Sequence, residues 1–139
     1  MNIYFACSIT GGREFEPVYQ AITAALLADG HTVPTAHLAG ADVKDLEAVV
    51  NPRDVYTRDV NWIRQCDMLV AEVSTPSHGV GYEVAFALGL GKHVLCLYRE
   101  AVPVSKMITG NSSPNLTVET YRSAAQAVQA VRTFLAYHR

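Results

Sequence analysis

The stretch from Asp67 to Gly89 constrains the fold of this chain more than any other. An apolar run over Asp67–Val73 predicts a buried strand, and the alanine- and leucine-containing segment Val84–Gly89 predicts a packed helix. Between them lies the glycine-bearing turn Thr75–Glu83. A strand–turn–helix unit of this kind directs free backbone N–H groups and the positive helix end toward one place, which favours an anion there. We therefore expect the chemistry of the chain at this turn.

Two interpretations of this turn remain open from the residues alone. In the first, Glu83 lies in the first turn of the helix and beside the position of the anion. In the second, Ser77 caps the helix and Glu83 is an ordinary acid of the first turn.

Composition narrows the class of protein. The 139 residues fit one domain that spans the whole chain, 1–139. A net charge of −2 provides no basic field for a DNA or RNA polymer. Cys7, Cys66 and Cys96 are dispersed in apolar runs, which indicates free thiols in a reducing compartment rather than a zinc site or disulfides. Without a basic leader or a membrane-length apolar run, we expect a soluble cytoplasmic protein, and neither a metal nor an organic cofactor is indicated.

Strands and helices alternate along the chain. The expected strands are Asn2–Cys7, His31–Val33, Asp67–Val73, His93–Tyr98 and Leu116–Thr120. The expected helices are Glu14–Asp29, one that begins at Asn51-Pro52, one after the central turn, and Arg122–Tyr137. This order predicts a single α/β domain, Rossmann-like with flavodoxin-like strand order, in which helices flank a five-stranded parallel sheet. Ligands of such sheets bind beyond the carboxyl ends of the strands.

The loop after the first expected strand, Ser8–Arg13, has two adjacent glycines, Gly11 and Gly12, and two hydroxyls that could bind an oxyanion. A plain tight turn is the alternative, because the loop matches neither GxGxxG nor the P-loop pattern. For Arg13 we favour a solvated side chain over a phosphate contact.

A long segment with weak periodicity, 34–52, follows the second expected strand. We interpret it as a lid or binding loop with one short helix near Asp45–Val49. His37 is placed where its side chain can face a ligand, although lone histidines are more often surface or structural groups.

Asp59 lies at helical spacing from apolar neighbours in the next helix. An acid on or beside a buried face needs a partner or a function. The pattern also fits an ion pair with Arg58 or Arg64 on a solvated shoulder of the helix.

Two segments, Tyr4–Glu14 and Ala71–Glu83, closely resemble the 2′-deoxynucleoside 5′-monophosphate N-glycosidases, the Rcl proteins of the nucleoside 2-deoxyribosyltransferase superfamily. The similarity runs nearly end to end and includes Thr35–His37, Asp59 and Ser105–Ile108. The GVGYE sequence after a serine is its most specific part. The resemblance implies a hydrolase that cleaves the bond between base and 2-deoxyribose, giving a free base and 2-deoxyribose 5-phosphate.

The resemblance also implies roles for single residues. Glu83 matches the nucleophile that forms a covalent glycosyl-enzyme, and a carboxylate suits the oxocarbenium-like transition state. Tyr4 matches the tyrosine that orients this nucleophile. Asp59 matches a second acid, which positions the sugar or delivers a proton to the departing base. The implied substrate-binding residues are Ser8, Ile9, Gly11, Gly12, His37, Ser77, Gly79, Gly81, Ser105 and Met107.

Within that set, Ser8, Ser77 and the glycines match phosphate-binding loops, and His37 matches a position facing the base. Ser105 matches a serine that reaches the phosphate of the neighbouring subunit, which implies a homodimer. One departure is Thr10, because some relatives carry a basic residue there; part of the phosphate clamp would be missing or replaced by Arg13.

Two other functions stay open at this point. A transferase would use the same intermediate to move deoxyribose between bases, and a nucleotide-sensing module would bind the same ligand and cleave nothing. The coincidence of Tyr4, Asp59 and Glu83 favours catalysis over sensing.

Overall fold

The computed structural model describes residues 1–139 and contains one parallel sheet with the strand order β1-β2-β3-β4. The strands are β1 Ile3–Ala6, β2 Met68–Glu72, β3 His93–Arg99 and β4 Leu116–Tyr121. Every residue of β1 and β2 is buried, which explains why these strands are apolar without alternation up to Glu72. The buried Glu72 carboxylate accepts a hydrogen bond from the Tyr121 hydroxyl at 2.9 Å. The α/β class with a parallel sheet, predicted from the order of the elements, is confirmed.

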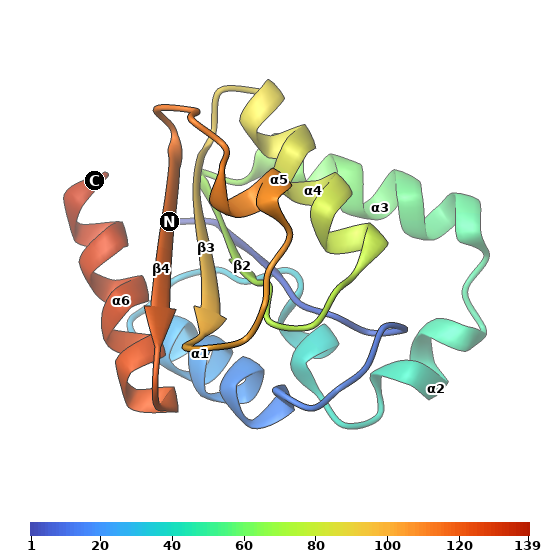
Figure 1. Ribbon diagram of the computed structural model, residues 1–139. Helices are drawn as coiled ribbons and strands as arrows, with labels where there is room; N and C mark the ends of the chain where they lie inside the picture. The colour runs from blue at the N-terminus through green and yellow to red at the C-terminus, as the bar shows by residue number, and fades with distance from the viewer.

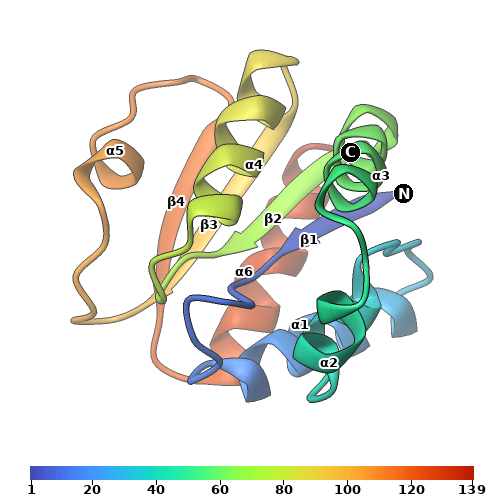
Figure 2. The same ribbon diagram turned by 90° about the vertical axis from the view of Figure 1, so that its right-hand side faces the viewer.

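Helices cover both faces of this sheet. They are α1 Glu16–Ala28, the 3₁₀ helix η1 Ala36–Ala39, α2 Val43–Ala48, α3 Pro52–Gln65, α4 His78–Gly89, α5 Lys106–Thr109 and α6 Ala124–Tyr137. Figures 1 and 2 show α1 and α6 on one face and α3 and α4 on the other. None of these helices has the length and apolar character needed to cross a membrane.

Alternate residues of β1 belong to different halves of the core. Ile3 and Phe5 pack with the α1 and α6 side chains, whereas Tyr4 and Ala6 pack with the α3 and α4 side. Successive side chains of a strand point to opposite faces, which explains this division. Tyr4 pairs in register with Leu69, which belongs to the same half of the core. The sheet therefore directs the phenol of Tyr4 toward α3 and α4.

The prediction of a fifth strand at His31–Val33 is wrong. This segment makes only an isolated parallel bridge, Asn2 with Thr32, beside β1. The Ile3 N–H donates to the Thr32 carbonyl at 2.8 Å and the Thr32 N–H to the Met1 carbonyl at 2.9 Å. Pro34 has no N–H and cannot extend this ladder, and the Phe5 N–H instead donates to Thr35 Oγ1 at 3.0 Å. The bridge still lies where the flavodoxin-like order places its second strand.

The segment 34–52 contains η1 and α2 rather than one helix alone. The helix expected near Asp45–Val49 is α2. The predicted start of α3 is confirmed, because the Asn51 side chain accepts a hydrogen bond from the Arg53 N–H at 2.9 Å. All three cysteines are free and buried, as predicted from their apolar surroundings.

Candidate active site

Ser77 sets where α4 begins. Its Oγ accepts a hydrogen bond from the Val80 N–H at 3.3 Å, and the helix starts at His78, after the loop 73–77 that follows the carboxyl end of β2. The predicted cap is thus confirmed, but the placement of Glu83 in the first turn is wrong. Because the cap falls at Ser77, Glu83 lies in the second turn, and the first turn carries no acid.

Glu83 and Tyr4 form a hydrogen-bonded pair between α4 and β1. The Tyr4 Oη donates to Glu83 Oε1 at 2.8 Å, and Tyr4 is fully buried. Burial, supported by the charge of Asp59, raises the pKa of Glu83 to about 7, against the opposing effect of the Tyr4 hydrogen bond. This carboxyl is therefore oriented by its neighbour, and its pKa lies well above that of an ordinary glutamate.

Asp59, on α3, shares a cavity of about 420 Å³ with Glu83. Its Oδ1 accepts a hydrogen bond from Arg58 Nε at 2.8 Å, and its side chain is only 16% exposed. The expected ion pair between Asp59 and Arg58 is confirmed. The expected position of Asp59 on a solvated shoulder of the helix is wrong, because its side chain is largely buried. Burial raises the pKa of Asp59, and the Arg58 guanidinium opposes that rise.

His37 lies on η1 at the same side of the molecule. Its Nε2 is 3.6 Å from Glu47 Oε1, and its ring meets the edge of the Trp62 ring with centroids 6.0 Å apart. Glu47 lines the cavity of Asp59 and Glu83. Sequence reasoning missed Glu47, because it lies in a segment whose weak periodicity gives no indication of which side chains face inward.

The loop after β1 touches the turn before α4. A Cβ atom on Gly11 would lie 2.3 Å from the Pro76 carbonyl oxygen and 3.1 Å from Ser8 Oγ, so only glycine fits there. The Ser8 Oγ is fully buried and has no hydrogen-bond partner. Gly12 has a φ of +134°, and Ile9 is half-buried in the same loop. The two loops expected to bind phosphate are therefore adjacent.

Arg13 is neither solvated nor free for a ligand. Its guanidinium donates to the carbonyls of Ser8 at 2.9 Å, Leu38 at 3.0 Å and Gly40 at 2.8 Å, and its Nε pairs with Glu16 at 3.0 Å. The side chain is 11% exposed. The prediction of a solvated Arg13 is wrong, and its donors tie the β1 loop to the η1 segment, so Arg13 does not replace a basic residue at Thr10.

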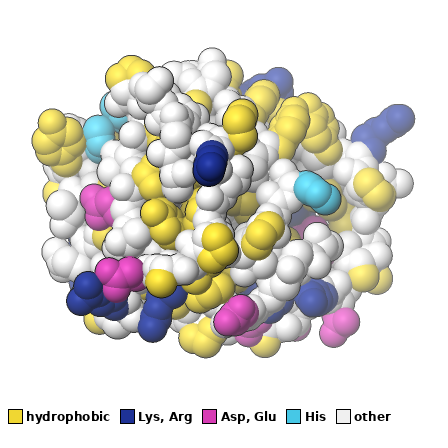
Figure 3. Space-filling model, viewed as in Figure 1, with side chains coloured by type: hydrophobic (Ala, Val, Ile, Leu, Met, Phe, Trp, Pro, Cys, Tyr) yellow, Lys and Arg dark blue, Asp and Glu magenta, His cyan; other side chains and the backbone are white.

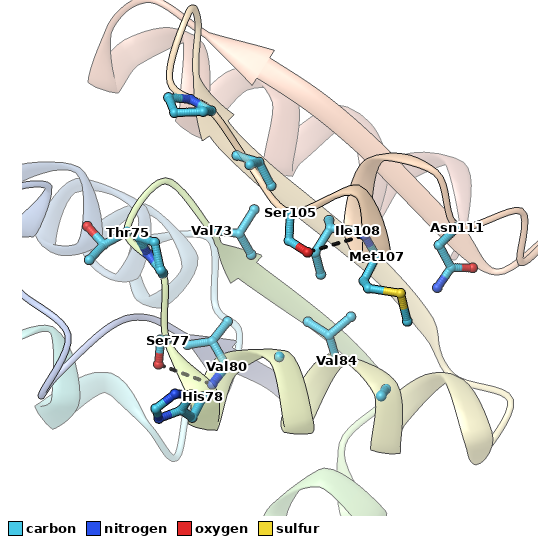
Figure 4. Close-up of a pocket in the computed structure, with 15 residues that line it drawn as sticks. Val73, Thr75, Ser77, His78, Val80, Val84, Ser105, Met107, Ile108 and Asn111 are labelled. Atoms are coloured by element: carbon cyan, nitrogen blue, oxygen red, sulfur yellow. Dashed lines mark hydrogen bonds between the residues drawn. The ribbon is translucent and has the colours of Figure 1, made fainter.

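A second cavity, of about 490 Å³, lies on the other side of α4 (Figure 4). Ser77 and Gly81 line one wall, and Ser105 and Met107 line the opposite wall, whereas Gly79 lines the cavity of Glu83. Figure 2 shows α4 between α5 and α3. The structure thus separates Ser105 and Met107 from Glu83.

Ser105 begins α5, and its Oγ accepts a hydrogen bond from the Met107 N–H at 3.2 Å. Met107 is 82% exposed. Figure 3 shows apolar side chains exposed across the middle of the face that carries α5.

Comparison with known proteins decides the family. The family model described as nucleoside 2-deoxyribosyltransferase matches residues 3–127. This chain belongs to the nucleoside 2-deoxyribosyltransferase family. The family resemblance predicted from the loops after β1 and β2 is confirmed.

Individual relatives agree with this assignment. A protein of Methanococcoides burtonii, provisionally named 2′-deoxynucleoside 5′-phosphate N-hydrolase 1, is 36% identical over 121 residues, which cover 87% of this chain and 99% of that protein. The rat 5-hydroxymethyl-dUMP N-hydrolase is 43% identical over 100 residues, 70% of this chain and 61% of that protein. The structure of a Clostridium botulinum CMP N-glycosidase matches in fold, with a TM-score of 0.72 at 19% identity over 95% of this chain and 98% of that one.

Proposed function

We propose that this protein hydrolyses the N-glycosidic bond of 2′-deoxynucleoside 5′-monophosphates and releases the free base and 2-deoxyribose 5-phosphate. The observation that carries the proposal is the Glu83 carboxyl, hydrogen-bonded by Tyr4 and sharing one cavity with Asp59 at the carboxyl edge of the sheet. The names of the curated relatives, which are N-hydrolases of deoxynucleotides, support the substrate class. The free buried cysteines fit action in the reducing cytoplasm.

In this mechanism the ionised Glu83 attacks the anomeric carbon as the bond to the base breaks. The carboxylate stabilises the developing positive charge of the sugar and then forms an ester with it. Asp59 suits the delivery of a proton to the departing base, because burial raises its pKa above that of an ordinary aspartate. Water then cleaves the ester, restores Glu83 and leaves a hydroxyl on the sugar.

The 5′-phosphate would bind at the junction of the two adjacent loops. The start of α4 offers backbone N–H groups and a positive helix end, and the buried Ser8 hydroxyl has no other partner. His37 would face the base from η1, on the side of Glu47 and Trp62.

Ser105 would act in a neighbouring subunit of a homodimer. Ser105 and Glu83 line different cavities on either side of α4, and the exposed Met107 beside Ser105 offers an apolar surface for a partner to cover. If this is correct, dilution to monomers lowers activity per site, and Ser105→Ala lowers affinity for the monophosphate more than for the nucleoside. A fully active monomer would exclude the shared site.

A product assay tests the reaction against its alternatives. The purified protein is incubated with each deoxy- and ribonucleotide, with and without the 5′-phosphate, in the presence of a different free base. Release of free base with 2-deoxyribose 5-phosphate supports the hydrolase. A new nucleotide would indicate the deoxyribosyl transfer that gives the family its name. Binding without any product would indicate a sensing module.

A further inference from the structure

Arg58 occupies a central place among the acids of the catalytic cavity. Its Nε donates to Asp59 at 2.8 Å, while Nη1 and Nη2 donate to the two carboxylate oxygens of Glu47 at 3.0 and 3.4 Å. The guanidinium also lies over the Trp62 ring, 4.9 Å from its centroid. A planar cation held by three hydrogen bonds and an aromatic ring has little freedom to turn.

Glu47 is the point at which α2 is held to the site. The helix has six residues, too few to be stable alone, and Val43 is its one buried residue. Its other large apolar side chain, Leu46, is 48% exposed, and Val49 just after it is 86% exposed. The contacts of Glu47 are polar: it pairs with Arg58 at 3.0 Å and lies 3.6 Å from His37.

The charges of the cavity explain why a cation is needed there. Glu47, Asp59 and Glu83 all line it, and Arg58 contacts two of these three acids. Without Arg58, the Asp59 carboxyl would lose its hydrogen-bond donor and would face Glu47 without an intervening positive charge.

We propose that Arg58 is a positioning residue: it fixes the carboxyl of Asp59 and, through its two hydrogen bonds to Glu47, pins α2 against the catalytic cavity. This role rests on the proposed N-glycosidase function, in which Asp59 meets the substrate. Arg58 itself acts through Asp59 and Glu47. The two acids are thereby coupled, so that movement of α2 disturbs the reacting centre.

The experiment compares Arg58→Gln, Glu47→Gln and the double variant with two controls. Arg53→Gln removes a charge from the exposed start of α3, and Asp45→Asn removes one from the exposed side of α2; neither side chain has an ion-pair partner. We expect kcat of Arg58→Gln to fall on the order of 10- to 100-fold with a smaller change in KM, because a displaced acid impairs the reaction step. Arg58→Lys, which keeps the charge but not the fork, should recover only part of that loss.

Coupling is read from the double variant. Once Arg58 is gone, removing the Glu47 charge should cost little more, so the two losses should not add. Fully additive losses, or a kcat for Arg58→Gln equal to that of Arg53→Gln, would overturn the positioning role.

Hydrogen exchange of residues 43–50 provides a readout that does not depend on turnover. Exchange should rise in both Arg58→Gln and Glu47→Gln and rise less in Asp45→Asn, whose charge contributes only the modest stabilisation of an exposed acid in the first turn of a helix. Unchanged exchange in Glu47→Gln would refute the pinning of α2, even if Arg58→Gln folds poorly. If the wild-type protein cleaves no deoxynucleotide, the proposed function fails, whereas this measurement still decides whether the pair holds α2.

Discussion

Removing the hydroxyl of Tyr4 should move the pH dependence of the reaction toward alkaline pH. Tyr4 donates to Glu83 at 2.8 Å, and a donor stabilises the ionised carboxylate, so its loss raises the pKa of Glu83. A hydrogen bond to a charged group contributes about 1.5–3 kcal/mol, which corresponds to about one to two pKa units. Starting from a pKa of about 7, the value in Tyr4→Phe should be about 8–9.

The assay is the pH profile of kcat/KM between about pH 5 and pH 10, which reports the essential groups of the free enzyme. Glu83 must be ionised to attack, so activity falls as pH decreases through its pKa, and the acid limb should move upward in Tyr4→Phe. Tyr137→Phe is the matched control, because this tyrosine is 83% exposed near the end of α6. An acid limb that stays near pH 7 in Tyr4→Phe would refute the reasoning.

Three further changes test other parts of the site. Glu83→Gln should abolish turnover. When unfolding is measured above pH 7, the variant should also have a higher midpoint temperature, because an acid whose folded pKa is raised from 4.5 to about 7 destabilises the fold by up to about 3 kcal/mol once it ionises. An unchanged or lower midpoint temperature would contradict this. Gly11→Ala should destabilise by about 1–3 kcal/mol in urea unfolding, because its Cβ would meet the Pro76 carbonyl, whereas Gly89→Ala, whose Cβ meets nothing, should be neutral or stabilising. Ser8→Ala should raise KM for the monophosphate much more than for the free nucleoside, and equal increases would exclude a phosphate contact.

Local signals in the sequence predicted the starts of helices and the buried strands well. Ser77 and Asn51 act as caps through their own side chains and the next few N–H groups, so short-range patterns were enough to identify them. The apolar runs of β1 and β2 likewise predicted burial on both faces.

What the sequence could not predict depends on contacts between distant segments. Thr32 forms only an isolated β-bridge, because Pro34 has no N–H to continue the strand pairing. The Phe5 N–H donates to the Thr35 hydroxyl instead. Arg13 is charged and lies in a glycine-rich loop, a context that predicts a solvated side chain, but its guanidinium donates to the carbonyls of Leu38 and Gly40.

The site was predicted through the family resemblance rather than through spacing. Tyr4 and Glu83 are far apart in sequence, and no periodic pattern indicates that the phenol meets the carboxyl. The pairing of Glu47 with Arg58 gave no sequence signal, because it joins a short helix to the middle of a longer one.

The alternation along β1 makes strand alignment a requirement for chemistry as well as for folding. Tyr4 points to the side of α4 and Phe5 to the side of α1, so a slip of one position would exchange them. The benzyl group would then face the acid, and the phenol would be trapped in the opposite apolar layer. Insertions or deletions in this strand therefore cannot be tolerated by repacking alone, and any attempt to graft the site onto another scaffold must copy the phase of the strand together with its residues.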